Sequence, residues 1–280
     1  MPEIPHVRLS LSNRAENVLL VRQALSGLAE TVGLDPIALN DISTAVSEAC
    51  NNVVLHAYGG EEGPLEIEVY ASAEGLEVLV RDSGGGIHPR EQQAEDVIGG
   101  IGLPVIRALS SSVEFRSLDG AGTEVRMRFA AANARALEPE RGEQAVSPHA
   151  IPREQLAATT EIVVGPAPLA RAVLPRVLCA LAARSYFSTD RISDTQLLAD
   201  AIATHVQDSI NGSRLSVQIT AHPRDLQLRI GPLRPGRAET VLESASVGGV
   251  GSVLERLADG HQVSREGSSE VLGLRLAERS

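Results

Sequence analysis

The sequence predicts an α+β protein made of two similar units in tandem, and three observations support this prediction. The 280 residues exceed what one hydrophobic core of ordinary size fills. Segments with strand alternation and segments with helical spacing follow one another in the same order in both halves. The glycine clusters IGGIGL at 98–103 and VGGVGS at 247–252 lie at similar places in the two halves, as in a duplicated domain.

The first half begins with a strand and two helices. Alternation at 7–11 predicts the strand, and an apolar stripe over 18–32 predicts the first helix. Asp35-Pro36 starts a second helix, which has the 3, 4, 7, 8 spacing of a buried face and ends at Gly59-Gly60.

Strand signals dominate the rest of the first half. Two alternating runs joined at Glu74-Gly75 predict a β-hairpin. A glycine-rich loop leaves the second run, and the cluster at 98–103 opens a third helix. The predicted strands are residues 65–70, 76–80, 113–115 and 124–129.

The same order returns after a segment rich in Ala, Glu, Gln and Pro, a composition typical of linkers. The predicted elements are a strand at 161–164, helices at 169–184 and 195–210, and strands at 215–220, 226–230 and 268–276. We therefore expect a first domain at 1–135, a linker at 136–160 and a second domain at 161–280.

Composition and charge exclude several classes of protein. Neither a membrane-spanning apolar run nor a signal peptide pattern occurs, which predicts a soluble cytoplasmic protein. Cys50 and Cys179 show no metal or disulfide spacing. The net charge is −11, of which residues 1–135 carry −9, so neither nucleic acid nor an anionic membrane is an expected ligand. The absence of lysine excludes a Walker A phosphate loop.

Four polar or glycine motifs follow one another in the first half. Glu48 and Asn52 lie four residues apart on one side of the second helix, and Asp82 ends a strand before the loop Ser83-Gly84-Gly85-Gly86. Gly100 and Gly102 open a helix whose unpaired N–H groups could hold an anion, and Thr123 precedes the last strand. Each motif alone has an ordinary structural interpretation: a solvated helix edge, a turn, a helix start or a β-turn hydroxyl.

In this order the motifs resemble those of the histidine-kinase-like (GHKL) ATPase superfamily. VSEACNNVVLHAY at 46–58 and VRDSGGGI at 80–87 are similar to anti-sigma factor serine/threonine kinases. The resemblance covers about residues 5–130. It implies α/β sandwich domains, each with a mostly antiparallel sheet and helices packed on one face, with ATP between the sheet, a helix and a lid at about 87–99.

The resemblance also implies residue roles. Asp82 would accept the adenine amino hydrogens, Asn52 would supply its amide oxygen to Mg²⁺, and Glu48 would be the catalytic base. The remaining nucleotide-binding positions are Gly84, Gly86, Gly100, Gly102 and Thr123. Arg90 in the lid and His56, one turn beyond Asn52, are weaker candidates, and His56 suits capping or packing equally well.

The second half departs from this pattern at the positions that bind ATP. Asp200 stands in place of Glu48, Thr204 in place of Asn52, and Pro232 in place of Asp82. Apolar residues persist on the matching helix, namely Leu197, Leu198, Ala201, Ile202 and Val206. We therefore expect a degenerate domain that binds no nucleotide and packs on the first as the partner in an internal pseudo-dimer.

The function implied by the resemblance is that of a cytoplasmic serine kinase and anti-sigma factor. It would phosphorylate an anti-anti-sigma antagonist protein, sequester a sigma factor and so regulate transcription. The alternative is a non-catalytic, ATP-gated interaction module, which would not need the base Glu48. A histidine kinase is disfavoured because too few residues for a phospho-accepting helical hairpin precede Val7.

Overall fold

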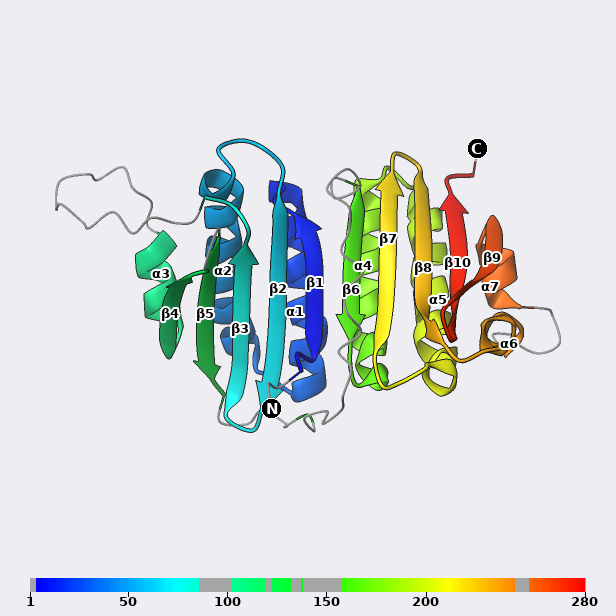
Figure 1. The fold of residues 1–280 in the computed structure, drawn as a ribbon, viewed down its shortest axis with the longest axis horizontal. Helices are drawn as coiled ribbons and strands as arrows, with labels where there is room; N and C mark the ends of the chain where they lie inside the picture. Colours follow the sequence, from blue (N-terminus) through cyan, green and yellow to red (C-terminus); the bar gives the residue numbers. More distant parts are fainter. Residues whose placement is uncertain are drawn as a thin grey trace.

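The computed structural model describes residues 4–85, 102–118, 122–131, 137, 158–244 and 252–279. In these residues the strands form one ten-stranded sheet in the order β4-β5-β3-β2-β1-β6-β7-β8-β10-β9, and each neighbouring pair is antiparallel. The long helices α1, α2, α4 and α5 lie together behind the sheet (Figure 1). The predicted α+β class, with helices on one face of an antiparallel sheet, is confirmed.

The first half follows the predicted order. Its elements are β1 (Val7–Ser12), η1 (Ala15–Asn17), α1 (Val18–Val32), α2 (Pro36–Asn52), η2 (Val53–Ala57), β2 (Pro64–Ser72), β3 (Gly75–Asp82), α3 (Gly102–Leu109), β4 (Ser112–Ser117) and β5 (Thr123–Ala130). Asp35 caps α2, since its Oδ1 accepts the N–H groups of Ile37 and Ala38, both at 2.9 Å. η2 is a π-helical turn that continues α2 directly.

The second half repeats this order with one additional helix, α6. Its elements are β6 (Thr159–Val164), η3 (Ala167–Leu169), α4 (Ala170–Arg184), α5 (Thr189–His205), η4 (Gln207–Ser209), β7 (Leu215–His222), β8 (Asp225–Leu233), α6 (Arg237–Ser244), α7 (Val253–Leu257), β9 (Gly260–Glu266) and β10 (Ser269–Ala277). The helix predicted at 195–210 was misplaced. It begins at Thr189 because Ser188 caps it, and it ends at His205.

The sequence did not predict α6, α7 or β9. β9 is exposed along most of its length, so it lacks the alternation that marks a strand. Leu197 was also wrongly predicted to pack, because its side chain is 56% exposed, whereas Leu198, Ile202 and Val206 are buried.

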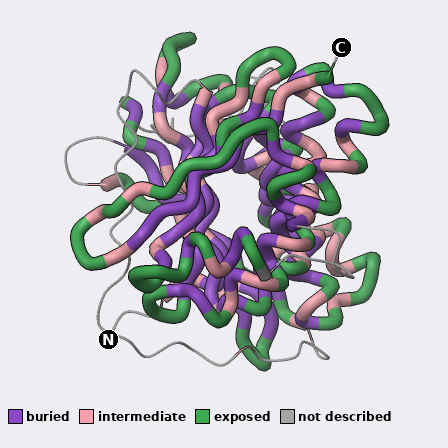
Figure 2. The backbone as a smooth tube through the Cα atoms, turned by 90° about the vertical axis from the view of Figure 1, so that its right-hand side faces the viewer, coloured by how far each residue is buried: buried purple, intermediate pink, exposed green. Residues whose placement is uncertain are grey.

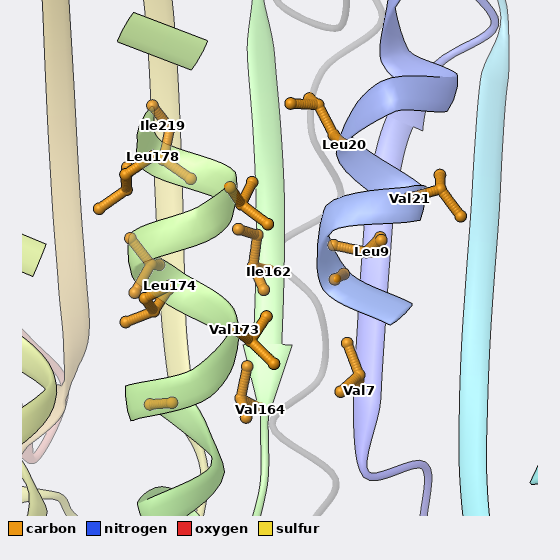
Figure 3. Close-up of a cluster of buried hydrophobic side chains, with 14 of the residues drawn as sticks. Val7, Leu9, Leu20, Val21, Ile162, Val164, Val173, Leu174, Leu178 and Ile219 are labelled. Atoms are coloured by element: carbon orange, nitrogen blue, oxygen red, sulfur yellow. The ribbon is translucent and has the colours of Figure 1, made fainter. Parts of the chain in front are cut away.

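The two halves join through equivalent elements, the first strand and first helix of each. β1 pairs with β6 in a register that sets Val7 opposite Val164 and Leu9 opposite Ile162. Figure 3 shows the apolar side chains packed on this junction, with Leu20 and Val21 coming from α1 and Val173 and Leu174 from α4.

Buried apolar residues of both halves form a single core cluster. In Figure 2 the buried residues follow the strands and the covered helix faces, while exposed residues lie mainly at the loops. The boundary at 135/136 stays a prediction, because residues 132–136 and 138–157 lie outside the described part. The boundary predicted at 160/161 falls inside β6, which begins at Thr159. Within the described residues, no helix is both long and apolar enough to cross a membrane.

Candidate functional site

Asp82 is the buried carboxylate at the end of β3. Its side chain is 2% exposed, and its Oδ1 accepts the N–H of Gly84 at 2.9 Å. Oδ2 is buried and has no hydrogen-bond partner within the described residues. Burial raises the pKa of this carboxyl, opposed by hydrogen bonds from Gly84 and from the backbone and side chain of Thr123. An unpaired buried acceptor is costly, and it is typical of a position that a ligand donor completes.

Glu48 and Asn52 converge on the first residue of α3. A Cβ built on Gly102 would lie 3.0 Å from Glu48 Oε2 and 3.6 Å from Asn52 Oδ1. Both side chains are half-buried, on the last two turns of α2. The predicted carboxylate and amide pair is therefore brought together with Gly102, where any larger residue would displace the Glu48 carboxylate.

The end of the second helix holds the loop that follows Asp82. A Cβ on Gly84 would lie 2.0 Å from the carbonyl oxygen of Ala57, in the π-helical turn, so only glycine fits there. The N–H of Gly85 donates to the same carbonyl at 2.9 Å. π-Helical turns inside helices occur frequently at functional sites. Here the turn fixes the glycine loop against the helix that carries Glu48 and Asn52.

Thr123 lies beside Asp82 because Gly122 lets the two chain segments touch. Gly122 has φ +110°, and a Cβ on it would lie 2.1 Å from the carbonyl oxygen of Asp82. Thr123 is buried, and its backbone and side chain oppose the rise in the pKa of the Asp82 carboxyl. The structure therefore joins the predicted Gly-Thr motif to the predicted adenine acceptor.

Sequence reasoning gave no role to Tyr58, which supports the same loop. Its hydroxyl accepts the N–H of Ser83 at 2.8 Å and donates to the carbonyl of Pro64. The one sequence feature that could have pointed to Tyr58 is its place directly after the helix that carries Glu48 and Asn52. His56 is exposed. Gly86, Gly100, Arg90 and the lid at 87–99 lie outside the described residues.

The described residues fit an adenine nucleotide. Asp82 Oδ2 is an unsatisfied acceptor for an amino group, and Gly84 and Gly122 bring the backbone close to the Asp82 loop. Within the described residues no group of three or more His, Cys, Asp or Glu side chains is placed to hold a metal ion. Asn52 Oδ1 would be one oxygen ligand of Mg²⁺ beside phosphate oxygens and water, the ligand set that this ion prefers.

The equivalent positions of the second half form no such site. The predicted matches of Asp200 with Glu48 and of Thr204 with Asn52 are wrong by one residue. α2 and α5 are both 17 residues long and begin after the caps Asp35 and Ser188, which sets Ala201 and His205 at the places of Glu48 and Asn52. Asp200 and Thr204 are both exposed on α5, and Pro232 lies within β8. α6 contributes the buried residues Ala238, Val241 and Leu242 to the core. Glu270 accepts N–H groups of Gly236 and Ala238 at the start of this helix, which holds α6 onto the sheet.

Comparison with known proteins identifies the relatives of this chain. The family described as the histidine kinase-like ATPase domain matches residues 11–129. Serine-protein kinase RsbW of Bacillus pumilus is 31% identical over 132 residues, covering 41% of this chain and 80% of that protein. RsbW of Listeria innocua is 37% identical over 121 residues, covering 39% of this chain and 77% of that protein.

A third relative has a different printed name. The anti-sigma F factor of a Thermoanaerobacter species is 30% identical over 131 residues, covering 43% of this chain and 90% of that protein. These matches span most of each relative and somewhat less than half of this chain, in agreement with the motifs gathered around Asp82. The chain belongs to the anti-sigma kinase family of histidine kinase-like ATPases.

Proposed function

We propose that this protein is a cytoplasmic, ATP-dependent serine kinase that phosphorylates an anti-anti-sigma antagonist and sequesters a sigma factor. The observation that carries the proposal is the convergence of Glu48 and Asn52 on Gly102, at the end of the helix that also holds the Asp82 loop. The kinase and anti-sigma names of the relatives support it.

Asp82, Asn52 and Glu48 have separate roles in the proposed reaction. Asp82 Oδ2 accepts the adenine amino group, which selects adenine because guanine presents an oxygen acceptor there. Asn52 Oδ1 orients the metal, and Glu48 accepts the proton of the attacking serine hydroxyl. Bound Mg²⁺·ATP supplies the phosphoryl group and neutralises its charge, so the protein mainly positions the reactants.

The second half serves as a built-in partner in an internal pseudo-dimer. Its β6 and α4 occupy the edge of β1 and the apolar face of α1, which are the equivalent elements of the first half. Polar contacts flank this junction. Arg184 Nη1 donates to Asn17 Oδ1 at 2.6 Å, and Arg176 pairs with Glu30.

Phosphopeptide mapping tests the kinase. The full chain is incubated with Mg²⁺·ATP and a candidate antagonist domain, and the product is analysed by mass spectrometry. The proposal expects one phosphoserine on the antagonist with the parent and almost none with Glu48→Gln. ATP binding without transfer to any antagonist would instead support the non-catalytic interaction module.

A further inference from the structure

The first half contains a cavity of about 610 Å³ that lies away from Glu48 and Asp82. It is bounded by the start of α2, the end of α3 and the end of β5. Its walls are mostly apolar, with the carboxylates of Asp35 and Asp41, and none of the described residues that line it is basic. The question is what this cavity accepts.

In the second half the same place is filled by the side chain of Arg191, near the start of α5. This side chain is 2% exposed. Its Nε donates to the carbonyl of Ala277 at 2.8 Å, and its Nη1 donates to the carbonyl of Leu257 at 2.8 Å and to Asp194 at 3.1 Å. It also pairs with Asp259. The guanidinium thus ties α5 to the ends of α7 and β10.

Matching hydrogen bonds show that the helix starts correspond. The Asp35 carboxylate caps α2 by accepting the N–H of Ala38 at 2.9 Å. The Ser188 hydroxyl caps α5 by accepting the N–H of Arg191 at 3.3 Å. Ala38 therefore occupies the position of Arg191, and Asp41, three residues later, occupies that of Asp194.

The other two walls correspond as well. The N–H of Ser111 donates to the carbonyl of Arg128 at 2.8 Å, and the N–H of Asp259 donates to that of Arg275 at 2.8 Å. The side chains of Ser111 and Asp259 each accept a backbone N–H group from the end of the last strand of their half. Ser111 Oγ accepts the N–H of Ala130 at 3.0 Å, and Asp259 Oδ2 accepts the N–H of Ala277 at 2.7 Å.

The first half therefore keeps two carbonyls and one of the two carboxylates that hold the guanidinium, with Ser111 in place of Asp259, but has lost the arginine. The carbonyls of Leu109 and Ala130 stand in place of those of Leu257 and Ala277, and Asp41 remains as the counter-charge. The two sites lie at opposite ends of the molecule, by α3 and β4 and by α7 and β9 (Figure 1). The side chain of Arg191 fills the site in the second half, whereas the matching cavity in the first half is open.

We propose that the cavity binds an arginine side chain presented by a partner protein. A planar guanidinium has five donors in a fixed fork, which suits a site made of two carbonyls and a carboxylate. The apolar walls at Ile37 and Phe129 suit the residues next to that arginine. The net charge of −9 on residues 1–135 favours the approach of a basic partner. The proposal does not rest on the kinase function.

Binding of a small arginine probe to the full chain tests the site without nucleotide. N-acetyl-arginine methylamide is titrated against the protein, and the backbone amide signals of Ala38, Asp41 and Ser111 are followed by NMR. We expect saturable shifts that are about tenfold weaker with the citrulline analogue, which keeps the shape but lacks the charge. Asp41→Asn should weaken arginine binding similarly, whereas Asp200→Asn, on an exposed position of α5, should not. Equal binding of the two probes, or no saturable shift, would overturn the proposal.

A gain-of-contact variant provides the second test. Ala38→Arg restores the residue found at the equivalent position, so it should raise the thermal unfolding midpoint and abolish probe binding. Ala38→Met, similar in bulk but uncharged, should not raise the midpoint. An Ala38→Arg variant that is no more stable than Ala38→Met would contradict the equivalence of the two sites. If the parent self-associates and Ala38→Arg alone is monomeric, the occupant is a second copy of this chain, and the assignment to a partner protein fails.

Discussion

Gly27 in α1 packs directly on the backbone of α4 at Ala172. A Cβ on Gly27 would lie 2.3 Å from the carbonyl oxygen of Ala172 and 3.0 Å from Cα of Val173. The helices of the two halves therefore meet backbone to backbone at this point, and the sheet continues beneath them from β1 to β6.

Replacing Gly27 with alanine tests this junction, because close packing predicts a loss of folding stability where an exposed helix would gain it. Alanine normally stabilises a helix interior by about 1 kcal/mol relative to glycine. Gly27→Ala should instead destabilise the protein by about 1–3 kcal/mol, because the added carbon overlaps the α4 backbone. Denaturant unfolding measures the difference. Gly260→Ala, where a Cβ meets nothing within 4 Å, is the control and should change little. A stabilised Gly27→Ala variant would show that α1 and α4 do not meet this closely.

Asp82→Asn should weaken ATP binding while stabilising the nucleotide-free protein at neutral pH. Burial raises the folded-state pKa of Asp82 above its unfolded value. Protonation of Asp82 therefore stabilises the folded state at low pH, and this contribution to stability is lost as pH rises through the folded-state pKa. The asparagine variant should therefore be more stable than the parent above that pKa, and the gap should close as pH falls towards the unfolded value of about 3.9.

Thermal unfolding over a pH series and calorimetric ATP titration check the two effects separately. Glu66→Gln, on the partly exposed ion pair with Arg8, is a control for the loss of one acid elsewhere on the sheet. Unchanged ATP affinity in Asp82→Asn would remove the adenine assignment.

Glu48→Gln should keep ATP affinity and slow phosphoryl transfer by roughly 10² to 10⁴ fold, the usual contribution of a positioned base. The amide keeps the shape that fits beside Gly102 but cannot accept the proton. Single-turnover transfer from labelled ATP measures the rate. Transfer at the parental rate would mean that another group takes the proton.

Asn52→Ala should remove most of the Mg²⁺-dependent part of ATP affinity, since the amide oxygen is the proposed metal ligand. Calorimetry with Mg²⁺ and with EDTA separates this part from metal-independent binding. The control variant is Thr204→Ala, at an exposed position near the end of α5, which should behave like the parent. Equal Mg²⁺ dependence in Asn52→Ala and the parent would contradict the role.

The full chain should bind one ATP, because the second half lacks counterparts of Asn52 and Asp82. It should sediment as a monomer, because the second half already covers β1 and α1. A fragment of residues 1–135 exposes that strand edge and apolar helix face, so it should dimerise or aggregate. Equilibrium sedimentation and nucleotide titration measure both properties. Two ATP per chain, or a stable monomeric fragment, would contradict the internal pseudo-dimer.

The sequence by itself determined the order of the elements in the first half and the motifs of the candidate site. These depend on local signals: Asp35 and Pro36 start α2 through a cap and a fixed φ, and Gly75 in the β2–β3 turn has φ +136°. Spacing along one helix was enough to place Glu48 and Asn52 on the same side.

Only the tertiary structure decided which surfaces meet. Strand signals mark Val7 and Ile162 as apolar core positions but do not say that β1 pairs with β6, because the partner of a strand is set by docking of distant segments. The unpaired Oδ2 of Asp82, the contact of Gly27 with Ala172, and the cavity that corresponds to Arg191 are also relations between distant segments. They exist only once burial of the apolar faces has fixed the helices on the sheet.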